Sequence, residues 1–306
     1  MKYVLSIDGG GIRGLIPALV LADLEKKTGK RTHQLFDLIC GTSTGGIIAL
    51  GVTVDDGAGE ARFSALQISK IYEDRGRDIF SRSVWKGVST AGGLSDEKYS
   101  AQGLETVLDE YLSDQLMGAG LKPTLIPSYD IQGRTPLFFK SWHGEHQGLE
   151  MRHVARATSA APTYFEPALV AVDGAMRALV DGGVYINNPA VSAYVEAKKL
   201  FPGEEIKLLS LGTGELVRPI AYEEARGWGK LEWAQPVMGC IFDGVSDAAD
   251  YQMTELLEGN YLRLQYALEH ASDDLDNATQ GNIENLKSVA RKLLRTHKAE
   301  IEGFFE

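Results

Sequence analysis

The chain has 306 residues, of which 44% are hydrophobic, and this length suffices for one large α/β domain or two small ones. Its 31 basic and 42 acidic residues give a net charge of -11, which argues against a nucleic-acid-binding surface and gives no general attraction to anionic lipid. The two cysteines, Cys40 and Cys240, lie far apart in sequence. Residues 1–10 lack the long apolar region and the small-residue cleavage site that are typical of a signal peptide, and no run of about 18 apolar residues occurs. We therefore expect a cytoplasmic protein without disulfides.

The N-terminal segment predicts two strand-turn-helix units. An apolar run at residues 3–7 ends in glycines, and apolar residues then recur at helical spacing from Leu15 until Gly29 stops the helix. Residues 36–41 predict a second buried strand, which a tight turn joins to a helix starting near Ile47. Two successive units of this kind imply a parallel sheet with helices on its faces.

The middle of the chain is more irregular. We expect a helix at residues 63–75, a Gly- and Ser-rich loop that contains Trp85, and a helix at residues 102–112. Strand-like runs follow at residues 124–131 and 136–142, and then a helix that must end near Pro162.

The last third begins with a strand, a turn and a helix at residues 178–201, with Asn188 as the N-cap and Pro189 at the first helical position, and a buried strand follows at residues 206–214. Beyond Glu215 the pattern is mostly helical, with one late strand at residues 261–266. The final helix carries a single apolar stripe formed by Ile283, Leu286, Ala290, Leu293 and Ile301. No repeat or linker is apparent, so we assign this tail to the same globule.

The segment GTSTG at residues 41–45 is the first candidate for chemistry. It matches G-x-S-x-G between a predicted strand and a predicted helix, which is the context that a nucleophile elbow requires. Ser43 would sit at a helix N-terminus, where backbone N–H groups favour developing negative charge. The alternative is an ordinary tight turn with an incidental serine.

A nucleophilic serine needs a base, and the histidines fit that role poorly. His297 lies beside the apolar stripe of the last helix and His270 lies in a charged, solvated stretch. Asp181 instead ends an apolar strand, at the sheet edge that also carries Ser43, where partial burial would raise its pKa. An ordinary Asp-Gly turn is the alternative there. The cluster of His143, His146 and His153 lacks the partners that complete a metal site.

The glycines at residues 9–11 and 14 fit G-x-G-x-x-G after a strand, which is also the pattern of a dinucleotide site. Asp8 directly before them would repel a pyrophosphate, and the next strand does not end in an acidic residue. Bare glycine N–H groups beside a serine are better suited to an oxyanion hole, in which one donor contributes about 3 to 4 kcal/mol. Arg13 would add positive charge near that oxyanion or near a substrate phosphate.

Three motifs, DGGGIRG at 8–14, GTSTG at 41–45 and DGG at 181–183, closely resemble those of the patatin-like phospholipase family. The segments ATSAAPTYF at 157–165 and LLSLGTG at 208–214 resemble further landmarks of that family. The resemblance implies a three-layer α/β/α patatin-like fold with a mostly parallel central sheet. Residues 1–215 would form the catalytic domain, and residues 216–306 a mostly helical C-terminal extension of the same globule.

The resemblance also implies a lipid acyl hydrolase of the phospholipase A or lysophospholipase type that uses a Ser-Asp dyad without a metal or cofactor. Ser43 matches the nucleophile and Asp181 the general base. The oxyanion loop is matched by Gly9, Gly10, Gly11 and Arg13. The supporting motif positions are matched by Gly14, Gly41, Gly45, Gly182 and Gly183, the last of which is alanine in many members.

The expected substrate is a phospholipid or another glycerolipid, met through transient contact with a membrane surface. That contact would use apolar residues near the mouth of the site, with Trp85 as a candidate. Two alternatives stay open: a non-catalytic lipid-binding or storage protein on the same scaffold, and a nucleotide-binding oxidoreductase. The sequence identifies no site for a small-molecule activator, and it does not indicate the headgroup, acyl-chain or positional preference or the oligomeric state.

Overall fold

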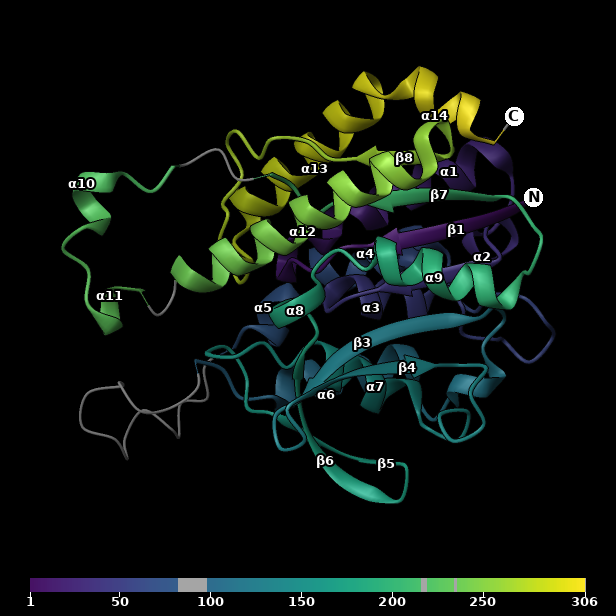
Figure 1. The fold of residues 1–306 in the computed structure, drawn as a ribbon, viewed down its shortest axis with the longest axis horizontal. Coiled ribbons are helices and arrows are strands. Elements are labelled where there is room, and N and C mark those ends of the chain that lie inside the picture. Colours follow the sequence, from purple (N-terminus) through teal and green to yellow (C-terminus); the bar gives the residue numbers. More distant parts are fainter. Residues whose placement is uncertain (82–97, 216–218, 234–235, 306) are drawn as a thin grey trace.

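The computed structural model describes residues 1–81, 98–215, 219–233 and 236–305 (Figure 1). One eight-stranded sheet runs through the molecule in the order β5-β6-β3-β2-β1-β7-β8, and β4 pairs with β3 outside this path. The strands are β1 (Lys2–Ile7), β2 (Leu38–Gly41), β3 (Thr124–Asp130), β4 (Thr135–Lys140), β5 (Ala168–Val172), β6 (Ala175–Asp181), β7 (Ile206–Leu211) and β8 (Tyr261–Leu264).

The sheet is parallel from β3 through β2, β1 and β7 to β8 and antiparallel at its other end. There, β4 and β6 both run antiparallel to β3, and β5 forms a hairpin with β6. The sequence pattern did not predict β5. The mixed, mostly parallel sheet with helices on both faces confirms the expected three-layer α/β/α architecture.

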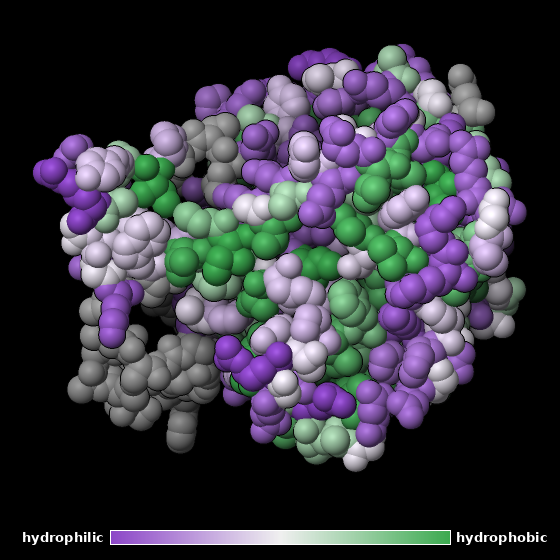
Figure 2. All heavy atoms as spheres, in the orientation of Figure 1, coloured by the Kyte–Doolittle hydropathy of each residue, from purple (hydrophilic) through white to green (hydrophobic). Residues whose placement is uncertain are grey.

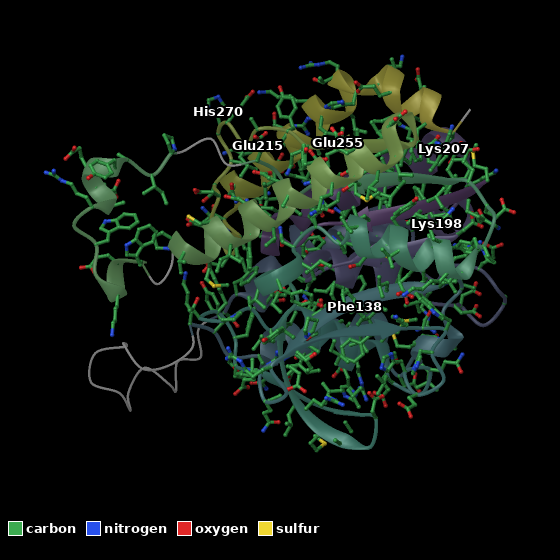
Figure 3. The ribbon with its side chains drawn as sticks, in the orientation of Figure 1. Phe138, Lys198, Lys207, Glu215, Glu255 and His270 are labelled. Atoms are coloured by element: carbon green, nitrogen blue, oxygen red, sulfur yellow. The ribbon has the colours of Figure 1, made fainter. Side chains whose placement is uncertain are left out.

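Helices cover both faces of the sheet because the buried parallel strands are apolar on both sides. Leu5 and Ile7 of β1 belong to the larger core cluster, with α1, α3, α4 and α13, whereas Val4 belongs to a second cluster with α9 and α12. Phe138 on β4 packs against this second cluster (Figure 3). The longer helices are α1 (Leu15–Thr28), α3 (Thr44–Gly51), α4 (Ala65–Glu73), α6 (Gln102–Leu112), α7 (Met151–Thr158), α9 (Ala190–Leu200), α12 (Pro236–Leu257) and α13 (Gln280–Thr296).

The shorter helices lie in the connections or close the chain, and they are α2 (Thr32–Leu35), α5 (Gly76–Ile79), α8 (Gly183–Ile186), α10 (Tyr222–Ala225), α11 (Lys230–Trp233) and α14 (Lys298–Phe304). Short 3₁₀ turns are η1 (Gly11–Gly14), η3 (Met117–Ala119) and η4 (Glu258–Asn260). No helix in the described ranges has the length and apolar character needed to cross a bilayer.

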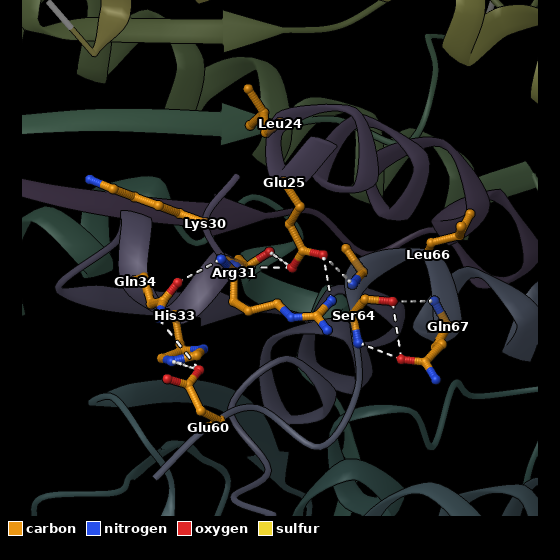
Figure 4. A network of polar contacts seen from close by, with 12 residues as sticks. Leu24, Glu25, Lys30, Arg31, His33, Gln34, Glu60, Ser64, Leu66 and Gln67 are labelled. Carbon is orange, nitrogen blue, oxygen red and sulfur yellow. Dashed lines mark hydrogen bonds and ion pairs between the residues drawn. The ribbon is translucent and has the colours of Figure 1, made fainter. Parts of the chain in front are cut away.

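Glu25 near the end of α1 joins three helices (Figure 4). One carboxylate oxygen accepts hydrogen bonds from the backbone N–H and the hydroxyl of Thr32 in α2, and the other accepts the N–H of Ala65 at the start of α4. Acceptors at a helix N-terminus satisfy N–H groups that have no partner within the helix. These contacts join the end of α1 to the N-termini of α2 and α4.

The C-terminal extension is built into the sheet and both layers. Its strand β8 pairs with β7, α12 packs against α8 and α9, and α13 packs against α1. Helices α10 and α11 form an arm beyond the N-terminal end of α12 (Figure 1), and hydrophobic residues gather on the surface over the N-terminal part of α12 (Figure 2). The expected single last helix is wrong, because α13 ends at Thr296 and Ile301 lies on α14, where it is nevertheless buried.

Candidate active site

Ser43 occupies a strained turn between β2 and α3. Its backbone has φ 54° and ψ -122°, outside the conformations that a non-glycine residue normally adopts. The flanking glycines allow this turn through close packing, since a Cβ on Gly41 would overlap the carbonyl oxygen of Gly45, and one on Gly45 would overlap that of Ile7. This is the strand-turn-helix geometry of a nucleophile elbow.

Asp181 lies directly beside Ser43 although it comes 138 positions later in the sequence. The Ser43 hydroxyl donates a hydrogen bond of 2.5 Å to Oδ2 of Asp181, and the N–H of Gly183 donates one of 2.7 Å to Oδ1. Sheet pairing brings them together. The start of β3 pairs with β2, which leads into Ser43, and the end of β3 pairs with β6, where Ser128 lies opposite Asp181. Both oxygens of the carboxylate are therefore fixed by donors.

Burial determines how readily the carboxyl of Asp181 loses its proton. Asp181 is 1% exposed, and desolvation raises its pKa to about 7, against the hydrogen bonds from Ser43 and Gly183, which lower it. A carboxylate with a pKa near neutrality and a hydroxyl hydrogen-bonded to it has the properties of a general base.

Thr158 holds the backbone of the serine turn. Its hydroxyl accepts a hydrogen bond from the N–H of Ser43 at 3.0 Å and donates one to the carbonyl of Pro127 at 2.6 Å. Thr158 lies within the segment 157–165 that resembles a landmark of the family, but the sequence pattern alone indicates no role for it. A hydroxyl that donates and accepts at once can link α7, β3 and the Ser43 turn.

The glycine loop presents two free amides near Ser43. The N–H of Gly9 donates to the carbonyl of Asn187 at 3.1 Å, so it is not available as an oxyanion donor, which corrects that part of our expectation. In the described part of the chain, no hydrogen bond uses the N–H of Gly10 or Gly11, and both residues line the pocket that contains Ser43. Only glycine fits at Gly11, which has φ 57° and whose Cβ would overlap the carbonyl oxygen of Leu275.

Arg13 fixes the orientation of this loop. Its side-chain Nε donates to the carbonyl of Gly10 at 3.3 Å, and its backbone N–H donates to the same oxygen at 3.1 Å. In a trans peptide the N–H of the next residue points away from that carbonyl, so these bonds also orient the N–H of Gly11. Arg13 itself is only 5% exposed.

Asp8 turns away from the glycine amides. Arg263 on β8 binds both of its carboxylate oxygens, at 2.9 and 2.6 Å, and also donates to the hydroxyl of Ser210. The charge of Asp8 is thus compensated by a residue 255 positions away, and our argument that it repels a pyrophosphate does not hold in this structure. The sequence offered no local signal for this pair.

The pocket at Ser43, which we call the Ser43 pocket, is mainly apolar. Gly10, Gly11 and Asp181 line it close to the serine, and the side chains of several helices complete it. Its apolar lining includes Ile47, Ile79, Phe80, Leu104, Phe165 and Phe242. A pocket with a few polar groups at one point and an apolar wall suits a ligand with one polar group and a hydrocarbon chain.

The histidines lie elsewhere. Neither His270 nor His297 lines the Ser43 pocket: His297 contacts Glu300, and His270 is exposed (Figure 3). The ring of His146 accepts a hydrogen bond from the N–H of Lys140. In the ranges that the structure covers, no group of three or more His, Cys, Asp or Glu residues could hold a metal. Trp85 falls outside the described residues.

Comparison with known proteins places this geometry in a family. The profile described as Patatin-like phospholipase matches residues 5–194. Patatin-like protein 4 of Arabidopsis thaliana is 31% identical over 96% of this chain and 83% of its own length, and Patatin-2-Kuras 3 of Solanum tuberosum is 33% identical over 96% and 84%. Among solved structures, VipD from Legionella pneumophila aligns with a TM-score of 0.42 and 11% identity, covering 97% of this chain and 67% of that one. This chain belongs to the patatin-like phospholipase family, whose membership supports lipid acyl hydrolase activity.

Proposed function

We propose that the protein is a serine-dependent hydrolase that cleaves fatty-acyl esters of glycerolipids, as a phospholipase A or lysophospholipase, through a Ser43–Asp181 dyad. The observation that carries this proposal is the 2.5 Å hydrogen bond from the Ser43 hydroxyl to a buried carboxylate whose pKa lies near 7. Family membership supports the broader activity, and the geometry supports the assignment of roles.

In the first half of the reaction, Ser43 Oγ attacks the ester carbonyl carbon while Asp181 Oδ2 takes the hydroxyl proton. The carbonyl oxygen becomes an oxyanion, and the N–H groups of Gly10 and Gly11 are the donors that would stabilise it. When the tetrahedral intermediate collapses, the alcohol of the glycerolipid leaves with the proton from Asp181. The product is an acyl-enzyme on Ser43.

In the second half, water attacks the acyl-enzyme. Asp181 takes a proton from this water, the tetrahedral intermediate forms again at the same donors, and the fatty acid leaves as the proton returns to Ser43 Oγ. The acyl chain would lie along the apolar wall that Ile47, Phe80 and Leu104 form. Arg13 is a positioning residue in this scheme, because it acts through the carbonyl of Gly10.

The test is hydrolysis of phospholipid in mixed micelles, measured as released fatty acid, together with hydrolysis of a soluble p-nitrophenyl ester. Ser43→Ala and Asp181→Asn should each lower kcat to background with both substrates. Ser69→Ala is the matched control, since Ser69 is a buried serine of α4 whose hydroxyl donates to the carbonyl of Leu66, and among the described residues it is not part of the lining of the Ser43 pocket. Lipid binding without turnover in the wild type would favour the non-catalytic alternative, and full activity in Ser43→Ala would exclude the dyad.

A further inference from the structure

A second cavity, which we call the Arg13 cavity, adjoins the Ser43 pocket. Arg13, the segment 161–164, the first turns of α12 and residues 273–275 contribute to its lining. Ala161, Tyr164, Phe242 and Leu275 line both cavities. A substrate whose ester lies at Ser43 therefore places its neighbouring groups in or near the Arg13 cavity.

Arg13 brings an unpaired, buried cation to this cavity. Its Nη1 is buried and has no hydrogen-bond partner, and none of the carboxylates in the described ranges forms an ion pair with the guanidinium. Burial lowers the pKa of Arg13, while the nearby charges of Asp243 and Asp273 raise it. A buried guanidinium with an unused N–H is costly unless an anion reaches it.

Among the described residues, the other charged residues that line the cavity are acidic. They are Glu232 on α11, Asp243 on α12, and Asp273 and Asp274 in the segment that follows. Asp243 is half-buried, and the described residues offer it neither a hydrogen bond nor an ion pair. Burial raises the pKa of this carboxyl, and the charge of Arg13 opposes that effect.

The unpaired charges of Arg13 and Asp243 limit the class of ligand that the Arg13 cavity can bind. A phosphodiester satisfies the free N–H groups of Arg13, because a guanidinium matches phosphate oxygens well. A ligand with a net negative charge would then meet the carboxylates of the same cavity. A zwitterion avoids this conflict, since its ammonium group can face Asp243, and the ring of Phe242, which lines the same cavity, attracts an ammonium.

We propose that the Arg13 cavity is a headgroup subsite for zwitterionic phospholipids, with the phosphodiester at Nη1 of Arg13 and the ammonium at the carboxylate of Asp243. This inference rests on the proposed function and extends it, because it assigns a headgroup class. Phosphatidylethanolamine should therefore be a better substrate than phosphatidylglycerol with the same acyl chains.

The experiment measures kcat/KM for both lipids in neutral detergent micelles, so that the charge of the surface stays constant. Asp243→Asn should lower the ratio of the phosphatidylethanolamine value to the phosphatidylglycerol value about tenfold, as expected for loss of one partly buried charge contact. Asp243→Lys should lower the ratio further and favour phosphatidylglycerol. Both variants should still hydrolyse a p-nitrophenyl ester, which has no headgroup and which shows that they are folded.

Glu255→Gln is the matched control, because Glu255 is an exposed acid on the same helix that does not line the cavity (Figure 3). Its ratio should equal that of the wild type. An unchanged ratio in both Asp243 variants, with ester hydrolysis intact, would overturn the headgroup assignment alone. Failure of the wild type to hydrolyse any of these esters would overturn the proposed function and this inference with it.

Discussion

Asp181→Asn should make the protein more stable at pH 8 while it removes the proposed base. Burial raises the pKa of Asp181 from its ordinary value of 3.8 to about 7, so the charged carboxylate destabilises the folded state. A shift of about three pKa units corresponds to about 4 kcal/mol in the free energy of unfolding. Asparagine keeps an oxygen for the N–H of Gly183 and offers an N–H to Ser43 Oγ, so neither neighbour loses its partner.

The gain in stability of Asp181→Asn over the wild type should increase with pH. Well below the ordinary pKa of 3.8 the carboxyl is protonated in both the folded and the unfolded state and carries no penalty. Between about pH 4 and pH 7 the unfolded chain ionises while the folded chain keeps its proton, so the wild type loses stability as pH rises. The excess stability of Asp181→Asn should therefore be small near pH 4 and reach a plateau above pH 7.

Urea unfolding followed by tryptophan fluorescence at pH 4.5, 6 and 8 measures this difference. Asp130→Asn provides a control in which the expected change of stability has the opposite sign. Burial tends to raise the pKa of Asp130, but hydrogen bonds from Gly133, Arg177 and Gln132 outweigh this effect and lower the pKa. That variant should lose stability at pH 8, and the loss should diminish as pH falls toward the ordinary pKa and below. The reasoning fails if Asp181→Asn is less stable than the wild type at pH 8, or if its advantage does not change with pH.

Three further predictions concern the site and its support. Because the base must be deprotonated, kcat/KM for a soluble ester should rise about tenfold from pH 6 to pH 8 around an apparent pKa near 7, and a flat profile would argue against Asp181 as the base. Arg263→Met should lower the free energy of unfolding by about 3 to 5 kcal/mol, because it leaves the buried carboxylate of Asp8 unpaired, and adding Asp8→Asn should recover part of that loss in the same denaturant assay. Gly45→Ala should lower the melting temperature because its Cβ would overlap the carbonyl of Ile7, whereas Gly244→Ala, which meets open space on α12, should raise stability by about 0.5 to 1 kcal/mol; equal effects at both positions would contradict the packing argument.

Local patterns predicted most elements of the fold because they depend on neighbours in sequence. The strand that precedes the glycines and the helix that Gly29 ends were correct, and Gly29 has the expected left-handed φ of 68°. Asn188 accepts the N–H of Ala190 with its side chain, but Pro189, one residue later than the expected cap, is the N-cap of α9. The break between α13 and α14 was missed, since neither glycine nor proline marks it at His297.

Long-range pairing could not be derived from such patterns. The contact between Ser43 and Asp181 depends on the register of β6 against β3, and the Asp8–Arg263 pair depends on β8 joining the sheet. The order of the motifs resembles that of the family and so indicated the contact between Ser43 and Asp181, but it did not indicate the Asp8–Arg263 pair. The hydrogen bond that the Gly9 amide donates could not be predicted from the sequence either, because its acceptor, the carbonyl of Asn187, is a backbone atom that no residue pattern identifies.

The pairing of Ser43 with a buried base is tested most directly by intact-mass spectrometry after exposure to a fluorophosphonate ester probe. Wild-type protein should gain one adduct, Asp181→Asn should gain it far more slowly, and Ser43→Ala should gain none. An adduct of the same mass on folded Ser43→Ala, or no adduct on folded wild type, would contradict the assignment of Ser43 as an activated nucleophile.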